Sequence, residues 1–473
     1  MGAGPAGVYA ADILTKSDVD VQIDLFEKLP APYGLVRYGV APDHPRIKGI
    51  VGALQKVLDK PSVRFFGNVE YGVDIKLDDL RQFYNAVIFS TGASCDRPLD
   101  IPGIDLPGSY GAADFVSWYD GHPDAPRTWP LTAKSVAVLG VGNVALDVAR
   151  VLAKSADELL VTEIPPNVYE GLAASPVTDV HVFGRRGPAQ AKFTPLELRE
   201  LDHSPSVEVI VHAEGIEFDE ASLAAIRSDK QVSMIVKTLQ EWAIRDVGSR
   251  PRRLHLHFLE APVEVLGTSS VSGLRTETQE LTGDGNVRGT GVYTDWDVQA
   301  VYRAVGYLST HLPDIPFDHV SGTIPHLAGR VLDLDEVPIP GVYVTGWIKR
   351  GPIGLIGHTK GDALETITSL LEDLDSLPRA ASSPDANHAA SSPDGSRAAS
   401  SPDGSRAEDP SDASHTEASR DAIVEFLEQR AVPFVTNEGW SRLDLHEMAL
   451  GALEGRERVK VVSREEMTAI SNG

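Results

Sequence analysis

Gly2-Ala3-Gly4-Pro5-Ala6-Gly7 and Gly140-Val141-Gly142-Asn143-Val144-Ala145 are two glycine-rich loops of similar pattern within one chain. Each opens an apolar, alanine-rich stretch of helical character, and each is followed by a strand-like run. Glycine permits the tight turn from strand to helix, and the free N–H groups at the helix start bind a pyrophosphate. The pattern predicts an α/β fold of two interleaved Rossmann-like domains, doubly wound and three-layered, each of which binds a dinucleotide.

A carboxylate follows the first loop at the spacing that suits a ribose. The strand-like run 19–26 ends at Glu27, about 20 residues past Gly7. A carboxylate at this place accepts hydrogen bonds from ribose hydroxyls, which favours a dinucleotide without a 2'-phosphate. The alternative is a surface glutamate at a strand end.

The second loop carries a different signal. A short apolar strand, 135–139, precedes it, and the next strand, 180–183, runs into Gly184-Arg185-Arg186-Gly187. Paired guanidinium groups bind a 2'-phosphate through charge-assisted hydrogen bonds, whereas a carboxylate would repel it. The second ligand is therefore predicted to be NADP(H), unless the arginines form a solvated turn. Two dinucleotides held face to face indicate hydride transfer.

Longer motifs resemble the adrenodoxin-reductase type of ferredoxin–NADP reductases. Besides the two loops, the resemblance rests on the blocks 26–28, 33–45, 142–150, 184–188 and 346–354. Their order and spacing match that family over about residues 1–375, with a weaker likeness in the C-terminal tail. The resemblance implies an FAD enzyme that takes a hydride from NADPH and passes single electrons to a ferredoxin- or adrenodoxin-like iron–sulfur protein, because a flavin can do both.

The resemblance also implies which residues contact the cofactors. For FAD they are the loop residues Gly2, Gly4, Ala6 and Gly7, with Glu27, Leu35, Tyr71, Trp347, Gly354, Leu355 and Ile356. For NADP(H) they are Gly140, Gly142, Asn143, Val144, Arg185, Arg186, Glu197 and Gly354. His44 and Asp147 match positions near the two reacting rings, where the family is thought to have a proton path through water. The alternative for His44 is that it only fixes its loop.

The strand that should precede the first loop is missing, because the chain begins with Met1-Gly2. In a doubly wound sheet this strand is central and buried on both faces. Burial of about five apolar residues contributes about 1.5–3 kcal/mol each, which is comparable with a typical domain stability of about 5–15 kcal/mol. We therefore expect the true start to lie upstream, at another initiation site or within a longer, fused polypeptide.

Composition sets further bounds on function. Cys95 is the single cysteine among 473 residues, which excludes internal disulfides and cysteine-based iron–sulfur or zinc sites, and we expect no metal site. It also argues against the thioredoxin-reductase branch, which needs a pair of redox-active cysteines. No apolar run reaches about 18 residues, so no membrane span is expected. A net charge of −25 opposes nucleic-acid binding. We expect a cytoplasmic monomer.

Ferredoxins are themselves acidic, so docking requires a local basic patch on this acidic chain. The candidates lie in the NADP-side segment, where the family presents its docking face: Arg199, Lys230, Lys237, Arg250, Arg252 and Arg253. For each of them the alternative is an ordinary solvated surface charge.

The predicted domain organisation is discontinuous. Residues 1–98 form the first part of the FAD domain, 99–332 the NADP domain, 333–377 the return segment, 378–420 a linker, and 421–473 the C-terminal tail of the FAD domain. The linker holds a nine-residue unit, Ala-Ala-Ser-Ser-Pro-Asp plus three variable residues, three times over. This unit has no apolar periodicity, so disorder is expected. Helices are expected over 361–374, 422–429 and 463–470.

Two other functions stay open at this stage. The chain could be the NADPH-oxidising flavoprotein subunit of a larger complex, like the small subunit of glutamate synthase, although that relative usually brings a cysteine-rich cluster domain. It could also be a nucleotide-binding or scaffolding protein that lost catalysis together with its first strand.

Overall fold

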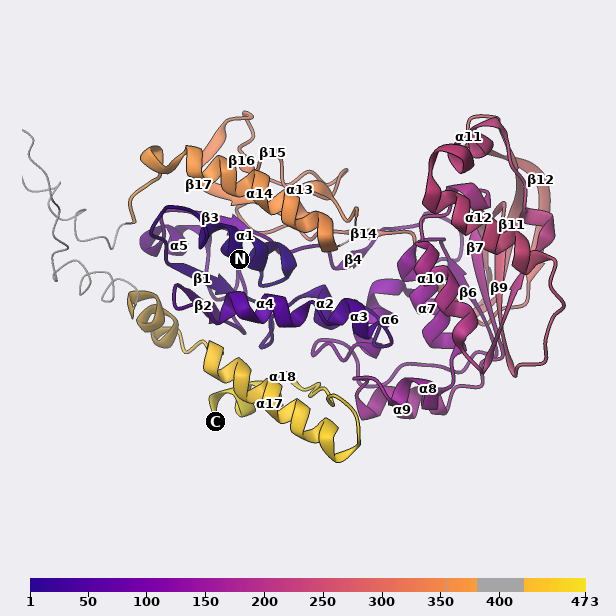
Figure 1. Cartoon of the computed structure of the whole chain (residues 1–473), viewed down its shortest axis with the longest axis horizontal. Helices are drawn as coiled ribbons and strands as arrows, with labels where there is room; N and C mark the ends of the chain where they lie inside the picture. Colours follow the sequence, from indigo (N-terminus) through magenta and orange to yellow (C-terminus); the bar gives the residue numbers. More distant parts are fainter. Residues whose placement is uncertain (355, 381–420) are drawn as a thin grey trace, which may run out of the picture.

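The computed structural model describes residues 1–354, 356–380 and 421–473. Leu355, one of the predicted FAD contacts, and residues 381–420, which hold most of the predicted linker and its repeats, lie outside the described residues. Two α/β units lie side by side along the long axis of the molecule (Figure 1). The first contains the N-terminal residues and the return segment, and the second contains most of residues 100–300.

The first unit has parallel strands on both sides of the first glycine loop. β1 pairs with β2, and β3 pairs with β17, which continues through β16 and β15. Met1 lies between these two sheets: its carbonyl accepts from Ser90 N at 2.8 Å, and Gly2 N donates to Phe26 O at 2.7 Å. The strand bounds are β1 Ile23–Phe26, β2 Val63–Phe66, β3 Val87–Phe89, β15 His326–Leu327, β16 Arg330–Leu332 and β17 Pro338–Val344.

Helices α1 (Pro5–Leu14) and α14 (Ile356–Glu372) pack against each other on one face of this unit. Helix α14 begins five residues before the expected start at residue 361, because Gly357 and Gly361 lie within it and conceal its periodicity. The other helices of this unit are α2 Leu35–Tyr38, α3 Pro45–Lys48, α4 Val51–Leu58, α5 Leu77–Phe83 and α13 Trp347–Arg350.

The second unit is built on a six-stranded parallel sheet with the order β5-β13-β6-β7-β9-β8. A three-stranded antiparallel sheet, β10-β11-β12, covers part of one face, while α7 covers the other. The strand bounds are β5 Ser109–Gly111, β6 Ser135–Leu139, β7 Asp179–Gly184, β8 Val207–Val211, β9 Arg252–Phe258, β10 Glu260–Gly267, β11 Val271–Leu281, β12 Val287–Trp296 and β13 Ala300–Arg303. The helices are α6 Ala112–Tyr119, α7 Asn143–Ala153, α8 Ala156–Leu160, α9 Pro166–Ala173, α10 Pro195–Glu200, α11 Glu220–Ser228 and α12 Lys230–Ala243.

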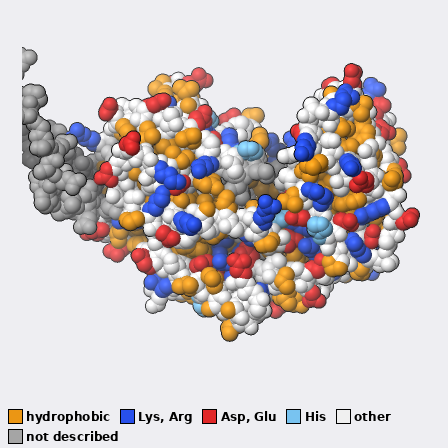
Figure 2. Space-filling model, in the orientation of Figure 1, with side chains coloured by type: hydrophobic (Ala, Val, Ile, Leu, Met, Phe, Trp, Pro, Cys, Tyr) orange, Lys and Arg blue, Asp and Glu red, His pale blue; other side chains and the backbone are white. Residues whose placement is uncertain are grey.

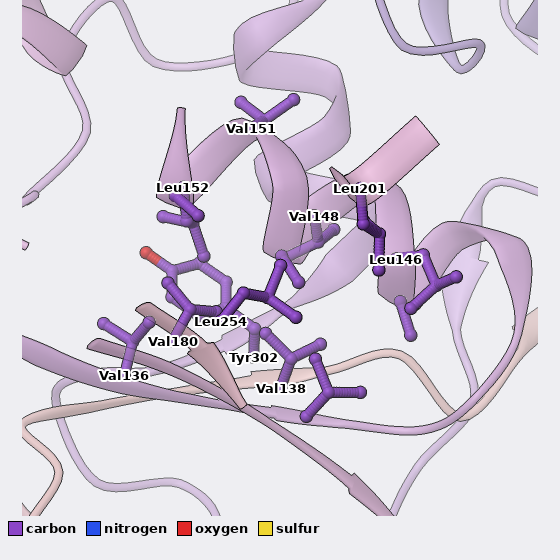
Figure 3. Packing of buried hydrophobic residues seen from close by; sticks show 14 of the residues in the cluster. Val136, Val138, Leu146, Val148, Val151, Leu152, Val180, Leu201, Leu254 and Tyr302 are labelled. Atoms are coloured by element: carbon purple, nitrogen blue, oxygen red, sulfur yellow. The ribbon is translucent and has the colours of Figure 1, made fainter. Parts of the chain in front are cut away.

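The core of the second unit lies between this parallel sheet and α7 (Figure 3). Val148 and Leu152 of α7 face Val138 and Val180 of the sheet, and all four are at most 2 % exposed. Val148 and Leu152 are four residues apart and share one helix face, while Val136 and Val138 occupy alternate positions on β6. The packing fixes α7, and with it the second glycine loop, at the carboxyl end of β6.

Two short strands connect the units. β4 (Cys95–Asp96) leads out of the first unit, and β14 (Tyr307–Leu308) pairs with it in antiparallel fashion on the way back. The chain therefore returns before β15, because β15 and β16 belong to the sheet of the first unit. The expected boundary at 332 was wrong by about 25 residues, since a long run of β-rich sequence gives no sign of passing from one sheet to another.

The C-terminal segment is helical and packs on the first unit. Residues 421–429 are helical, as expected, and α18 (Arg464–Asn472) matches the expected 463–470. Between them lies a helix that the sequence analysis did not predict, α17 (Asn437–Leu453). Its Trp440 is buried and donates from Nε1 to Gln55 Oε1 at 3.1 Å.

The predicted fold class is confirmed, with two Rossmann-like α/β units built on parallel sheets. Within the described part of the chain, the apolar helices are too short or too polar to cross a membrane.

Candidate functional site

The first glycine loop brings the backbone of two segments together. Gly4 is the N-cap of α1, and Gly34, at φ +49°, approaches it so closely that a Cβ on Gly34 would lie 3.2 Å from Gly4 Cα. Gly2, at φ +103°, has no room for a Cβ against Ser90 O. A larger residue at Gly2 or Gly34 would press on neighbouring backbone, so glycine lets these segments pack beside the start of α1, where free N–H groups can bind a pyrophosphate. The cradle therefore fits the phosphates of FAD.

Glu27 lies at the end of β1, beside this loop. Its Oε2 accepts from Ala3 N at 2.8 Å, and its Oε1 accepts from Leu29 N at 3.2 Å. Burial raises the pKa of Glu27, and the two backbone donors oppose this shift. The carboxylate is thus fixed next to the loop, where the sequence predicted a ribose contact.

The return segment meets the first loop at its glycine. Gly346 has φ +79°, and a Cβ built on it would lie 2.6 Å from Ala6 Cβ. Trp347 follows and begins α13, and Gly354, at φ +89°, precedes α14. Three segments far apart in the sequence, 2–7, 34–35 and 346–354, therefore line one side of the predicted FAD site.

Two of the predicted FAD contacts differ in their surroundings. Leu35 begins α2 directly after Gly34 and so borders the cradle. Tyr71 is 8 % exposed, packs edge-on against Phe89 at 5.0 Å between ring centroids, and donates its hydroxyl to Pro313 O at 3.1 Å. Its role toward FAD stays a prediction, and any contact would come from its ring.

Asp362 and Glu365 lie in the second and third turns of α14, because the helix begins at Ile356 and not at residue 361. There they bind the buried Lys349, whose Nζ is 3.0 Å from Asp362 Oδ1 and 2.5 Å from Glu365 Oε2. These carboxylates therefore hold the return segment against α14.

The second loop follows β6 at the point where the strand order reverses, which is the usual place for a nucleotide in such a sheet. Gly140 has φ +132°, and a Cβ there would lie 2.3 Å from Ala304 O. Gly142, the N-cap of α7, faces open space, with nothing within 4 Å of an added Cβ. Asn143 accepts at Oδ1 from Thr194 N at 2.9 Å, which ties this loop to α10. The open start of α7 fits the pyrophosphate of NADP(H).

Arg185 and Arg186 follow the last residues of β7, next to the second loop. Arg185 is exposed and Arg186 is half-buried. Among the described residues, neither guanidinium has a hydrogen bond or ion pair to another side chain. Two guanidinium groups without side-chain partners among the described residues, at the carboxyl end of β7, fit a 2'-phosphate.

A buried charge cluster joins the two units through His44. His44 Nε2 lies 2.9 Å from both Asp147 Oδ1 and Glu197 Oε2, and His44 Nδ1 lies 3.0 Å from Glu200 Oε2. His44 belongs to the first unit, while α7 and α10 supply the three carboxylates. The structure thus brings the two predicted tuning residues, His44 and Asp147, into direct contact, together with Glu197.

Arg150 completes this cluster. Its guanidinium binds Asp43 through Nε at 2.8 Å and Nη2 at 2.9 Å, and its Nη2 lies 2.8 Å from Asp147 Oδ1. Burial and the charge of Arg150 disfavour the charged form of His44, but the hydrogen bonds that His44 donates to Asp147 and Glu197 outweigh them and raise the pKa of His44 to about 10. Burial also opposes the charge of Asp43, but Arg150 holds the pKa of Asp43 far below its usual range.

Sequence reasoning missed Glu200 and Arg150. Both follow a predicted site residue by three positions, Glu197 and Asp147 respectively, on helices α10 and α7. Residues three apart share one helix face, so this spacing was a usable signal. It needed the helix assignments to be known first.

The predicted docking residues fall into three places on the second unit. Arg199 is on α10 beside the charge cluster, and Lys230 and Lys237 are on α12. Arg250, Arg252 and Arg253 lie at the amino end of β9, about 20 Å of strand away from the edge that carries the second glycine loop.

The similarity to known proteins extends over nearly the whole of this chain. It is 38% identical to NADPH-ferredoxin reductase FprA of Mycobacterium tuberculosis, over 100% of this chain and 98% of that protein. The chain belongs to the NADPH–ferredoxin and adrenodoxin reductase family. It is also 35% identical to human mitochondrial NADPH:adrenodoxin oxidoreductase, over 99% of this chain and 90% of that protein. The solved structure of M. tuberculosis FprA in complex with NADPH matches with a TM-score of 0.85 and 37% identity, covering 100% of this chain and 98% of that one. No protein-family model matches the sequence.

Family membership confirms the resemblance seen in the sequence motifs. The chain is an oxidoreductase of the flavoprotein class, with FAD and NADP(H) as its cofactors.

Proposed function

We propose that this enzyme oxidises NADPH on FAD and passes electrons singly to a ferredoxin-like iron–sulfur protein. When bound, FAD accepts a hydride and releases electrons one at a time, which is the chemistry that links the two substrates. The observation that carries the proposal is the pair of glycine cradles on facing units, one beside Glu27 and the other beside Arg185 and Arg186. Family membership favours this function over a glutamate-synthase-like subunit and over a protein without catalysis.

The first unit would hold FAD. The start of α1 would face the pyrophosphate, Glu27 the adenosine ribose, and the segments around Leu35, Trp347 and Gly354 the rest of the flavin. The left-handed glycines Gly34 and Gly346 support this assignment, because a side chain at either would collide with Gly4 or Ala6.

The second unit would hold NADPH. Gly142, Asn143 and Val144 would present the start of α7 to the pyrophosphate, and Arg185 with Arg186 would bind the 2'-phosphate. Glu197 lies in the charge cluster at the junction of the units, so it would contact the nicotinamide end.

His44 and Glu200 would handle a proton at this junction. His44 is 4 % exposed on its side chain, whereas the Glu200 side chain is 28 % exposed. The His44 Nδ1–Glu200 Oε2 contact of 3.0 Å therefore links a buried imidazole to a carboxylate that reaches solvent. We assign His44 and Asp147 to tuning and proton movement, as the sequence analysis expected.

The iron–sulfur partner would dock beside the hollow between the units. The face shown in Figure 2 is hollowed there, and lysine and arginine side chains gather next to the hollow. Of the six predicted docking residues, Arg199 lies beside the charge cluster at the junction, so we favour it as the contact nearest the cofactors.

We further propose that the enzyme is a cytoplasmic monomer, in keeping with its single cysteine and acidic charge.

The direct test is the flavin spectrum. NADPH should bleach the visible flavin band under anaerobic conditions, and ferredoxin with cytochrome c should restore it. A protein that binds FAD but is not bleached by NADPH would contradict the proposal.

Specificity for the 2'-phosphate gives a second test. A double substitution, Arg185→Ala with Arg186→Ala, should lower kcat/KM for NADPH by about 100-fold or more, because two charge-assisted contacts of about 1.5–3 kcal/mol each are lost. Turnover with NADH is the control and should change little.

Docking can be tested by comparing two charge reversals. Arg199→Glu should raise KM for ferredoxin while sparing NADPH-to-ferricyanide turnover. Arg253→Glu, at the far edge of the sheet, tests the other predicted group. If only Arg253→Glu raises KM, the partner docks away from the junction of the units.

A further inference from the structure

Four histidines gather on the face of the six-stranded sheet opposite α7, and His257 lies next to the carboxyl end of β9. His181 lies on β7, His255 and His257 lie on β9, and His212 directly follows β8. Neighbouring residues on the same strands, such as Val182 and Leu256, belong to the core beneath α7. Because side chains alternate along a strand, the histidines occupy the opposite face, which the three-stranded sheet partly covers.

The ring nitrogens converge. One ligand atom from each of His181, His255 and His257 lies within 4.8 Å of the other two, and His181 Nδ1 is 3.0 Å from His257 Nε2. His212 Nε2 is 3.2 Å from His255 Nδ1 and is the fourth nitrogen of the set. Imidazoles that share one zinc ion at about 2.0–2.1 Å are separated by about 3.4 Å between nitrogens. The rings of His181 and His255 are stacked, with 4.4 Å between centroids and 7° between planes, so the rings would have to rotate about their side-chain bonds to point their lone pairs at one ion.

A carboxylate orients one of the rings in the manner typical of metal sites. Asp179 Oδ1 lies 3.1 Å from His255 Nε2, and Arg253 fixes Asp179 at 2.7 Å. With Nε2 donating to this carboxylate, the lone pair of His255 is on Nδ1, which faces the other histidines.

The surroundings keep the imidazoles neutral, which is the state that binds a metal. Burial, together with the charges of the neighbouring histidines, lowers the pKa of His181 to about 3 and that of His257 to about 2. Trp296 lies over His257, with 4.5 Å between ring centroids. Ring packing alone does not account for the set, since phenylalanines would bury the same area without polar nitrogens to satisfy.

The charge cluster around His44 is the other group of potential metal ligands, and it differs because a guanidinium lies within it. His44, Asp147 and Glu197 also converge, but Arg150 Nη2 lies 2.6 Å from His44 Nε2 and 2.8 Å from Asp147 Oδ1. The guanidinium thus already supplies the cation there. In the described part of the chain, His181 and His257 make no hydrogen bond or ion pair with an arginine or lysine, and Arg253 acts on His181 only through its charge.

We propose that His181, His255 and His257 bind one divalent first-row metal ion of the Zn²⁺ type, with His212 as the nearest further donor. Imidazole ligands suit such ions. The ion would join β7, β8 and β9, and so would stabilise the NADP-side sheet without contacting either nucleotide.

The test measures binding of ZnCl₂ to the FAD-loaded enzyme, made without a polyhistidine tag and stripped with a chelator. Calorimetric titration should show one zinc ion per chain, and thermal unfolding should shift upward with zinc and back with EDTA. Co²⁺ should give the visible absorption of a tetrahedral site.

Substitutions that keep a ring but remove the nitrogen locate the site. His181→Phe with His257→Phe should abolish the zinc-dependent shift while leaving NADPH-to-ferricyanide turnover unchanged. Asp179→Asn should weaken zinc binding about 10-fold or more, because it removes the orienting carboxylate. The matched control is His203→Phe, an exposed histidine of the same unit outside the cluster. Absence of zinc binding by the unsubstituted enzyme, or equal binding by the double variant, would overturn the proposal.

Discussion

His44 and His257 are both buried histidines, and the folded protein shifts their pKa values in opposite directions. His44 lies among Asp147, Glu197 and Glu200, and its pKa rises to about 10. His257 lies among other imidazoles and Trp296, and its pKa falls to about 2. Burial disfavours the charged form of both, so the neighbours decide the outcome. The first cluster is suited to holding a proton, and the second to presenting lone pairs.

The largest effect should come from removing the cation of the first cluster. Arg150→Met leaves Asp43 and Asp147 as buried carboxylates without their guanidinium, which should cost about 3–5 kcal/mol of unfolding free energy. Urea denaturation of the FAD-loaded enzyme measures this loss. The matched control is Asp43→Asn in the Arg150→Met background, which should recover part of it. A loss below about 1 kcal/mol would contradict the role given to Arg150.

The pH dependence of the first cluster is the next largest effect. The folded pKa of His44, about 10, lies above the ordinary value of 6.5 for a histidine. The resulting stabilisation is therefore complete below about pH 6.5 and is lost as pH rises towards 10, with an expected size of roughly 1–3 kcal/mol. Unfolding measured from pH 6 to 10 should show this decline in the parent enzyme and a flatter profile for His44→Gln. Equal slopes for the two proteins would contradict a protonated His44.

The second cluster should respond to pH in the opposite sense. Because the pKa of His257 is lowered from 6.5 to about 2, the unfolded chain takes up a proton below pH 6.5 that the folded chain does not. Stability should fall on acidification by up to about 1.4 kcal/mol per pH unit from this residue. In EDTA, His257→Phe should reduce the slope between pH 6 and 5, while His203→Phe should not. An unchanged slope would show that His257 is already charged in the fold.

The smallest effect should come from Asp179, the carboxylate that contacts His255 of the four-histidine cluster. Burial is the main cause of the lowered pKa of His255, and the charge of Arg253 lowers this pKa as well, while Arg253 also binds Asp179, which contacts the His255 ring. Arg253→Ala should raise the pKa of His255 by a few tenths of a unit and change stability by at most about 0.5 kcal/mol, since Arg253 is exposed. NMR titration of the His255 ring protons measures the shift. A downward shift would mean that Arg253 acts mainly by orienting Asp179.

Local patterns predicted the nucleotide loops but not how distant segments meet. The loops at 2–7 and 140–145 and the arginines at 185–186 were recognisable because each works through backbone conformation and charge over a few residues. Helix α17 and the return of the chain at β14 escaped prediction, because no local signal marks where one sheet ends and another begins. The contact of Gly346 with Ala6 was likewise visible only once the fold was known.

The two histidine clusters separate most clearly what the sequence determines from what the tertiary structure decides. By itself the sequence predicted two dinucleotide sites and a 2'-phosphate contact at the second, and it determined the family and its cofactors. Only the tertiary structure joined His44 to Glu200 and Arg150, and aligned His181, His255 and His257 on one face. The physical reason is that a pKa depends on which charges and dipoles lie within a few ångströms, and those neighbours come from strands and helices far apart along the chain.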